Sequence, residues 1–510
     1  MSILVSILAI GILLLCTYKS YRAIRINLMG PWSNAPPGPS TYPFLGAIPS
    51  LVKDFWGSDR ALKSPIDFFD KLHDIYGEDF RLHNGIEDTI ILSSLNGIRE
   101  FSNHPNASFR PFNKVLMDIY SDGKDLGMGL GTGGERWKFL RRFSSSAFKS
   151  LSGGASGLNQ NFDLEVSEIV ADLRGKAKSP DPIIRNVNIY FDIPILNIIW
   201  WLVAGRRYKY GDPAIQKQFD YLKVLLEEPF IAPLTIIPFA LYIPPLRKIY
   251  NRIRNAMNSF RILLSKIVEE RRKDNFTDEK RGFIDLFLKA QLDDKDNPYL
   301  SNEDLIMCCQ DFFLAGAETS SKTLCTFILY MVLYPNIQEN AASEIRDAIQ
   351  KDTQIKSKDR HLLPYTDAVL MEVRRYATPF PITPFRCSNK DIRVNGFDIP
   401  ANVPVQVNLN GVLRSKYCWK APDIFNPSRF LNEKGAVEIP NAFMPFGFGR
   451  RRCIGEDIGN ISNFLIVSNL LHNFKFSASF SKNKNHLPSN DRFGGIIQGY
   501  EPFDVKIELR

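Results

Sequence analysis

The chain has 510 residues, of which 44% are hydrophobic and 23% charged, a composition typical of a large globular protein and not of a disordered one. Its formal net charge is +9, but no basic arm or basic-aromatic motif accompanies it, so nucleic-acid binding is not indicated. Seven cysteines without a C-x-x-C pair argue against a disulfide framework and a structural zinc site, and six scattered histidines argue against a histidine-built metal site.

An uncharged apolar run from Ile3 to Tyr18 opens the chain, and Lys19, Arg22 and Arg25 follow it. A secretory signal peptide would carry positive charge before the run and small residues at a cleavage site. At about 1.5 Å per residue the run spans roughly 24 Å, enough for a thin membrane. Because the basic residues follow it, we predict a single-pass anchor over residues 1–25, with a lumenal N-terminus and a cytosolic body. The alternatives are a cleaved signal peptide and a buried helix.

A proline-rich hinge is predicted over residues 26–49, which contain Pro36-Pro37-Gly38-Pro39. Proline fixes φ and has no N–H donor, so the segment predicts a stiff linker that sets the angle of the body to the membrane. The body then extends over residues 50–510, and its pattern is mainly α with small β-sheets, an α+β fold class.

The first part of the body mixes both kinds of element. A helix is predicted over Pro65–Tyr76 and strands are predicted between Asp79 and Leu92. Glycine-rich loops are predicted over Gly123–Gly134 and Ser152–Gly157.

The middle of the body, over residues 158–350, is predicted to be mainly helical, with apolar residues at helical spacing between Ile253 and Ile267. Pro229–Leu246 is apolar and long enough to suggest a second membrane span, but its five prolines disfavour a stable helix. It predicts a loop with short helices that reaches the membrane surface, and an ordinary buried loop is the equal alternative. Short strands and turns are predicted from about residue 384 to 440.

A capping-box pattern at Ser301 predicts the start of a long helix. The middle of that helix reads Ala315-Gly316-Ala317-Glu318-Thr319-Ser320. Thr319 lies one turn after Ala315, so the two side chains point the same way. Gly316 would loosen the helix locally, although close packing against a neighbour is the more usual reason for a buried glycine. Further on, Glu372 and Arg375 stand three residues apart on a helix and can form a salt bridge.

A lone cysteine, Cys453, lies in the segment FMPFGFGRRRCIGEDIG over residues 443–459. The glycines permit tight turns that point amide N–H groups at the sulfur. The arginines at 450–452 favour the thiolate, and a helix from Ile454 onward would stabilise it further through its N-terminus. A thiolate held in this way is suited to metal ligation.

The run Phe446-x-x-Gly449-x-Arg451-x-Cys453-x-Gly455 resembles the complete haem-binding signature of the cytochrome P-450 family. The A-G-x-E-T run at 315–319 resembles the family's oxygen-activation motif, and the E-x-x-R pair follows in the family's order. Details such as PPGP, SFRPF and WKFLRRF resemble animal microsomal members, a group that includes drug-metabolising and arthropod hormone-synthesising enzymes. The resemblance implies a cytochrome P-450 fold, with a cytosolic haem-thiolate catalytic domain over residues 50–510.

The resemblance also implies a haem b site. Cys453 would be the axial iron ligand, with Phe446 packed near it in the loop that contains Gly449 and Gly455. Three cations would balance the two haem propionates, which are costly to bury alone. They are Arg451, Arg386 and the arginine of the W-x-x-x-R pair formed by Trp137 and Arg141.

The remaining motif residues have catalytic or structural roles in the family. Ala315 and Gly316 would leave room for O2 and substrate, Thr319 would hydrogen-bond dioxygen, and Glu318 would help to relay protons. Glu372 and Arg375 would form a buried structural network that is completed by Arg429. From family topology, the substrate pocket would include Phe109 to Met117, Phe312, Ala315, Pro381 to Thr383 and Gly495 to Ile497.

These implications predict a monooxygenase of the endoplasmic reticulum membrane that inserts one atom of O2 into a steroid, terpenoid, sesquiterpenoid, fatty acid or xenobiotic. The chain has no nucleotide fingerprint or flavin domain, so NADPH would deliver electrons through a separate reductase flavoprotein, and a cytochrome b-type protein is a second candidate donor. Cations at 136–149 and 450–452 would dock an acidic reductase. The alternatives are a haem-thiolate isomerase or dehydratase and a non-catalytic haem sensor or carrier.

Overall fold

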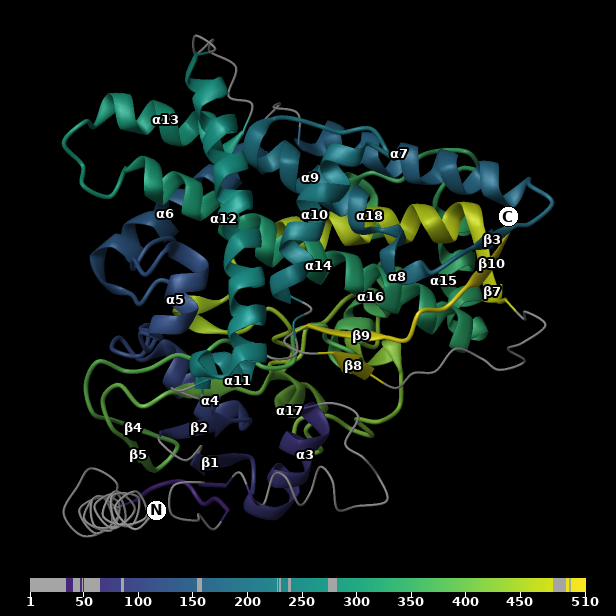
Figure 1. Cartoon of the computed structure of the whole chain (residues 1–510). Helices are drawn as coiled ribbons and strands as arrows, with labels where there is room; N and C mark the ends of the chain where they lie inside the picture. Colours follow the sequence, from purple (N-terminus) through teal and green to yellow (C-terminus); the bar gives the residue numbers. More distant parts are fainter. Residues whose placement is uncertain are drawn as a thin grey trace, which may run out of the picture. The chain divides into compact units, whose positions relative to one another are not determined.

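The computed structural model describes residues 34–39, 46–47, 49, 65–83, 87–153, 158–226, 228, 231–236, 240–273, 282–479, 492–494 and 497–510 (Figure 1). The predicted membrane anchor over residues 1–25 lies outside these ranges. The described residues form many helices and a few small sheets, as expected for the predicted α+β class. The chain divides into two compact units.

The smaller unit comprises residues 1–112, 381–420 and 446–452. Its described elements are α3 (Pro65–Tyr76), β1 (Asp79–His83), β2 (Asp88–Leu92), α4 (Leu95–Asn103), β4 (Ile392–Val394), β5 (Phe397–Ile399), β6 (Val405–Val407), α17 (Leu409–Arg414) and the 3-10 turn η4 (Gly449–Arg451). β2 pairs antiparallel with β1 and parallel with β6, while β4 and β5 form a hairpin. The predicted helix at 65–76 and the strands between 79 and 92 are therefore confirmed. The short helix α17 falls in a stretch where only strands and turns are predicted.

Part of the proline-rich hinge lies beside β1 in this unit. The Arg81 N–H donates to the Pro37 carbonyl over 2.7 Å. A Cβ atom on Gly38 would lie 2.1 Å from the Arg81 carbonyl oxygen, so only glycine permits this close approach. The described part of the hinge is thus attached to the smaller unit through its backbone.

The larger unit comprises residues 113–380, 421–445 and 453–510. Its described helices are α5 (Lys114–Ser121), α6 (Gly134–Gly153), α7 (Leu158–Ala177), α8 (Val187–Tyr190), α9 (Asp192–Ala204), α10 (Pro213–Leu226), α11 (Ile231–Ile236), α12 (Pro244–Lys273), α13 (Phe283–Asp293), α14 (Asn302–Leu333), α15 (Pro335–Ala348), α16 (Pro364–Tyr376) and α18 (Glu456–Asn473). Three 3-10 turns accompany them: η1 (Ala240–Tyr242), η2 (Ser357–Leu362) and η3 (Pro427–Phe430). β10 (Val505–Leu509) lies between β3 (Ile183–Ile184) and β7 (Phe474–Ala478), and β8 (Arg492–Gly494) pairs with β9 (Gln498–Tyr500).

The long helix α14 organises the core of the larger unit, where it packs against α9, α12, α16 and α18 (Figure 1). It begins where predicted, because the Asp304 N–H donates to the Ser301 hydroxyl over 3.0 Å. That hydroxyl in turn donates to the Asp304 carboxylate over 2.6 Å. Most side chains of α14 after this first turn are buried, which accounts for its apolar sequence.

Two predictions for the apolar and glycine-rich segments can be checked. In the described part of Pro229–Leu246, α11 and η1 precede the start of α12, which agrees with short helices joined by turns. The predicted loop at Ser152–Gly157 starts later than expected, since α6 continues to Gly153 and residues 154–157 lie outside the described ranges.

One described stretch, Val187–Ala204, has the length and apolarity of a membrane span, with a mean hydropathy of 1.5. In the structure 78% of it is buried within the protein. It covers α8 and α9, most of whose apolar side chains belong to the core around α14.

Candidate functional site

A strip of accessible small residues interrupts the buried surface of α14. Ala315 is exposed and Gly316, Thr319 and Ser320 are half-buried, whereas nearly all neighbouring residues of the helix are buried. Positions i, i+1, i+4 and i+5 lie on one face of a helix. The structure therefore places Ala315 and Thr319 on a common accessible face, as their spacing predicts.

Gly316 lies against α9. A Cβ atom on this residue would lie 2.9 Å from Cδ1 of Ile199, so the missing side chain lets the two helices approach closely. α14 runs as an α-helix from Asn302 to Leu333 without a break. The helix continues through Gly316, and close packing against Ile199 accounts for the glycine.

Thr319 and Glu318 are adjacent in sequence but have different surroundings. The Thr319 hydroxyl donates to the Ala315 carbonyl over 2.7 Å on the accessible face. Glu318 is only 3% exposed, and its carboxylate lies 3.9 Å from the Lys322 ammonium, one turn further along the helix. The hydroxyl thus lies at the accessible face, while the carboxylate is held in the core near a cation.

A second buried carboxylate, Asp192 of α9, lies beside the same part of α14. The Ser321 hydroxyl donates to it over 2.5 Å, and the Lys223 ammonium of α10 lies 3.2 Å away. Burial raises the pKa of Asp192, and Lys223, Ser321 and Lys322 offset part of that effect. Sequence reasoning missed Asp192, because no motif marks it and its partner Ser321 is 129 positions away.

The Cys453 thiol is exposed and belongs to the larger unit. Gly455 is the N-cap of α18, which begins at Glu456, two residues later than predicted. A Cβ atom on Gly455 would lie 3.9 Å from the Cys453 sulfur, so the sulfur lies close to the start of this helix. The partial positive charge of a helix N-terminus favours a thiolate at such a position.

The other described cysteines are less suited to become thiolates. Four of them are buried and the fifth is half-buried: Cys308, Cys309, Cys325, Cys387 and Cys418. Burial raises the pKa of Cys325 to about 12 and that of Cys387 to about 11, and it also raises the pKa of the remaining three. Because the thiolate is the metal-binding form, Cys453 is the best candidate ligand among the described cysteines.

The loop before Cys453, residues 446–452, belongs to the smaller unit. Phe446 is half-buried, and Gly447 and Gly449 have left-handed backbones with φ values of 77° and 71°. A Cβ atom on Gly449 would lie 2.2 Å from the Ser102 carbonyl oxygen. Glycine is therefore required at Gly449 both by its backbone conformation and by the close approach of α4.

The structure brings Arg386 and Arg451 close to the same chain segment within the smaller unit. Arg386 is 3% exposed, and its Nη1 lies 3.4 Å from the Ser102 hydroxyl oxygen. Arg451 is 8% exposed, and its Nε donates to the Ser108 carbonyl over 2.8 Å. Two cations that the resemblance assigns to haem propionates thus lie buried beside residues 102–108.

Arg110 is a third cation in this region and was not singled out from the sequence. Its Nη1 donates to the Phe385 carbonyl over 2.8 Å, next to Arg386. Burial raises the pKa of Cys387, and both Arg451 and Arg110 lower it again, so the two arginines lie near the same thiol. The signal in the sequence is the SFRPF run, which contains Arg110.

Trp137 and Arg141 lie one turn apart on α6 in the larger unit, as predicted. The Arg141 guanidinium is 5.7 Å from the centroid of the Trp137 ring. The indole N–H donates to the Met128 carbonyl over 3.2 Å, and the ring is 4% exposed. The tryptophan therefore also fixes the glycine-rich loop that precedes α6.

Glu372 and Arg375 form the expected salt bridge, and both side chains are fully buried. The Arg375 guanidinium donates to the Glu372 carboxylate over 2.6 and 2.9 Å. Arg429 Nε and the Asn426 N–H also donate to this carboxylate, over 3.1 and 2.8 Å. The four donors satisfy a charge that would otherwise be costly to bury, so the network joins α16 to η3.

Among the residues expected in the substrate pocket, Phe312 can be located and two others cannot. The Phe312 ring packs against Phe148 and Phe283, with centroid distances of 4.7 and 4.8 Å, in the aromatic core of the larger unit. Residues 495 and 496, also expected in the pocket, lie outside the described ranges.

Comparison with known proteins agrees with the motifs. The family model for cytochrome P-450 matches residues 36–507. Cytochrome P-450 2D15 of Canis lupus familiaris is 29% identical over 511 residues, which cover 98% of this chain and 97% of that protein. Cytochrome P-450 2D26 of Rattus norvegicus is 31% identical over 450 residues, 87% of either chain. Cytochrome P-450 2D6 of Homo sapiens is 30% identical over 478 residues, 92% of either chain.

Proposed function

Because this chain belongs to the cytochrome P-450 family, we propose that it inserts one atom of O2 into an apolar small molecule at a haem ligated by Cys453. The family's enzymes are haem-thiolate monooxygenases, and haem b is their cofactor. The observation that carries the proposal is the exposed Cys453 thiol, which directly follows an arginine-glycine loop and lies two residues before Gly455, the N-cap of α18.

The residues present fit a haem. The sulfur of Cys453 is the type of ligand that favours O2 chemistry at haem iron. The two propionates need cations, and buried Arg386 and Arg451 in the smaller unit and Arg141 in the larger unit are suitable partners. Phe446, which precedes the ligand by seven positions in the signature, would pack beside it.

Haem held by Cys453 would supply the reductive activation of O2, with one oxygen atom going to the substrate and the other leaving as water. In our proposal α14 provides the groups that handle protons. The Thr319 hydroxyl lies on the accessible face and can turn from the Ala315 carbonyl to donate to a ligand there. Glu318 lies behind this face near Lys322, where a carboxylate can accept and release protons.

The substrate is proposed to be apolar. The accessible strip of α14 carries only small side chains: the methyl group of Ala315 lies beside the hydroxyl groups of Thr319 and Ser320, and Gly316 has no side chain. Such a surface suits a steroid, a terpenoid or sesquiterpenoid, a fatty acid or an apolar xenobiotic.

Electrons are proposed to come from NADPH through a separate reductase flavoprotein, with a cytochrome b-type protein as a second donor. Lys138, Arg142 and Lys149 are exposed on α6 and could attract an acidic partner. Lys138 also pairs with Glu135, so Arg142 and Lys149 are the better candidates for the partner surface.

Membrane association is common to the microsomal relatives, and we propose the endoplasmic reticulum with a lumenal N-terminus and a cytosolic body. The segment around η1 supports a second membrane contact. Tyr242 is 86% exposed and Ile243 is 42% exposed, and the basic residues Arg247 and Lys248 follow at the exposed start of α12. Exposed apolar side chains beside cations are typical of a segment that lies on an anionic membrane surface.

The test combines purified full-length protein with a reductase and NADPH. Steroids, sesquiterpenoids and fatty acids are first screened by their effect on the haem spectrum, and compounds that bind are then assayed for an oxygenated product. The proposal expects a product that requires both NADPH and O2. Turnover without either would instead identify an isomerase or dehydratase, and ligand binding without any turnover would identify a sensor or carrier.

A further inference from the structure

The short helix α5, Lys114–Ser121, depends on other elements for its stability. Helices of about two turns are marginal on their own in water. Asn113 caps its N-terminus by accepting from the Leu116 N–H over 2.9 Å. At its other end Asp122 adopts a left-handed conformation with a φ of 51°, and the carbonyl groups of the last turn need donors from outside the helix.

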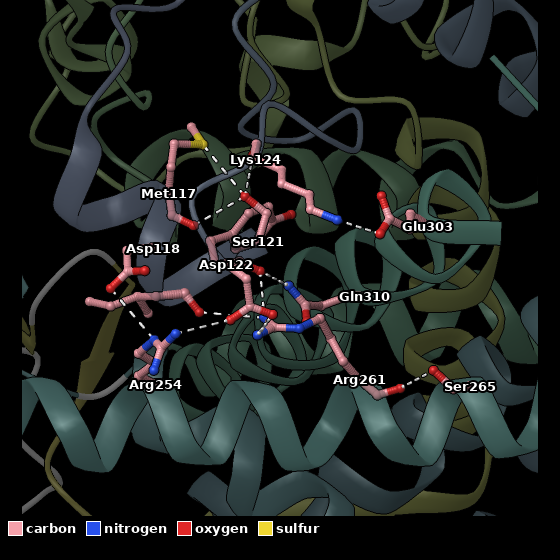
Figure 2. A network of polar contacts seen from close by, with 12 residues as sticks. Met117, Asp118, Ser121, Asp122, Lys124, Arg254, Arg261, Ser265, Glu303 and Gln310 are labelled. Carbon is pink, nitrogen blue, oxygen red and sulfur yellow. Dashed lines mark hydrogen bonds and ion pairs between the residues drawn. The ribbon is translucent and has the colours of Figure 1, made fainter. Parts of the chain in front are cut away.

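Arg261 of α12 supplies donors to two of these carbonyl groups (Figure 2). Its Nη1 donates to the Tyr120 carbonyl over 2.7 Å and lies 3.4 Å from the Ile119 carbonyl oxygen. Its Nη2 donates to the Asp122 carboxylate over 2.9 Å. The guanidinium thus binds the C-terminal carbonyls of α5, where the negative end of the helix dipole favours a cation.

Burying the charged side chain of Arg261 costs free energy, so its buried position indicates that its partners stabilise it there. Only 9% of it is exposed, and burial lowers its pKa while Asp122 raises it again. A desolvated cation persists when its hydrogen bonds are satisfied, and here the partners are the end of α5 and Asp122. Its position therefore ties α12 to the end of α5.

Further contacts join α5 to α11 and α14. The Gln310 side chain of α14 donates to the Tyr120 carbonyl over 3.0 Å, and Lys124 pairs with Glu303 near the start of α14 (Figure 2). At the other end of α5 the Asn113 amide donates to the Thr235 carbonyl of α11 over 2.7 Å. α5 is therefore held at both ends, and one of its anchors is α14.

This anchor lies close to the accessible strip of α14. Gln310 precedes Ala315 by five residues, which corresponds to about 7.5 Å along the helix axis and about 140° around it. Val115 and Leu116 on α5 are half-buried apolar side chains. The end of α5 is thus attached to α14 less than two turns before the strip that the proposed function assigns to substrate.

We propose that Arg261 is a positioning residue for substrate binding, because its bonds to the end of α5 and to Asp122 hold α5 against α12, beside the Gln310 anchor on α14. The proposal rests on the proposed function only for the identity of the bound compound. The attachment of α5 itself follows from contacts within the larger unit.

Two variants separate the contribution of the Asp122 carboxylate from that of all the Arg261 hydrogen bonds. Asp122→Asn removes the charge but keeps a residue that tolerates the left-handed backbone, and its side chain is 47% exposed, so the fold should persist. Arg261→Met removes all the donors but keeps an apolar side chain of similar length. Arg254→Gln is the matched control, because Arg254 also faces Asp122. Its side chain is 43% exposed, and its contacts with Asp118 and Asp122 are long, at 3.5 Å each.

Amide hydrogen exchange of residues 114–121 in the full chain tests the attachment without any substrate. We expect exchange to become about tenfold faster in Asp122→Asn, faster still in Arg261→Met, and less than about twofold faster in Arg254→Gln. Unchanged exchange in both test variants would overturn the proposal, whether or not the protein binds haem.

Spectral titration of the haem-loaded chain with imidazole and 4-phenylimidazole tests the effect on binding. Both probes ligate iron through nitrogen, but only the second has an apolar ring that can contact a neighbouring helix. We expect the dissociation constant of 4-phenylimidazole to rise about three- to tenfold in Asp122→Asn, while that of imidazole stays constant. Faster exchange with an unchanged ratio of the two constants would refute a role in substrate binding. A chain that binds no haem would refute the proposed function, and the exchange result would still decide whether Arg261 holds α5.

Discussion

Two glycines with left-handed backbones allow the packing of the cysteine loop to be tested. Gly449 has a φ of +71° and Gly435 a φ of +75°, so alanine should cost about 1–2 kcal/mol at either position through backbone strain. At Gly449 the added Cβ would also lie 2.2 Å from the Ser102 carbonyl oxygen, whereas at Gly435 it meets no atom of the described residues within 4 Å. We therefore expect Gly449→Ala to lower the free energy of unfolding in urea by clearly more than Gly435→Ala. Equal losses would contradict the close contact between this loop and α4.

The buried carboxyl of Asp192 predicts a pH dependence of stability. Burial raises its pKa above 3.8, so the folded protein holds this proton more tightly than the unfolded chain does. As the pH rises above about 3.8, the unfolded chain releases the proton first and the wild type loses stability until the folded carboxyl has also ionised. Asp192→Asn cannot lose this proton. Thermal unfolding at a series of pH values should therefore show the wild type losing stability relative to the variant, and a relative gain would contradict the direction of the pKa shift.

At the scale of the element, α14 begins with a local signal that can be removed. The Ser301 hydroxyl accepts from the Asp304 N–H, and replacing such a cap with alanine typically costs about 1 kcal/mol. We expect Ser301→Ala to lower the free energy of unfolding by about this amount. Ser167→Ala is the control, because Ser167 lies within α7 and its exposed hydroxyl hydrogen-bonds only to the Asp163 carbonyl and the Gln354 amide oxygen among the described residues. That change should be close to neutral, since alanine has the highest helix propensity.

The elements also differ in how much of their structure can be predicted from the sequence. The start of α14 and the Glu372–Arg375 pair are predictable, because the interacting residues stand three positions apart on one helix. Gly316 shows the limit of such reasoning. Its neighbour Ile199 comes from α9, and only the packed structure decides between a loosened helix and a close contact.

For the whole molecule, the mainly helical class with small sheets and the central helix were predictable from periodicity and motifs. The polar contacts that connect distant segments were not. Arg261 meets Tyr120 across 141 positions, and Asp192 meets Ser321 across 129. Such pairs depend on which helices pack together, and no local pattern marks either partner. The family resemblance supplied Arg386 and Arg451 as paired cations, whereas their neighbour Arg110 emerged only from the fold.

The central claim concerns one sulfur atom, because haem binding and oxygen chemistry both depend on a thiolate at Cys453. The direct test is the absorption spectrum and haem content of purified Cys453→Ala, compared with the wild type. Cys418→Ala is the matched control, since Cys418 is half-buried and burial raises the pKa of its thiol. We predict that Cys453→Ala loses the thiolate-ligated Soret band and most of its haem, while Cys418→Ala retains both. A Cys453→Ala protein with the full haem content and the spectrum of the wild type would contradict the account.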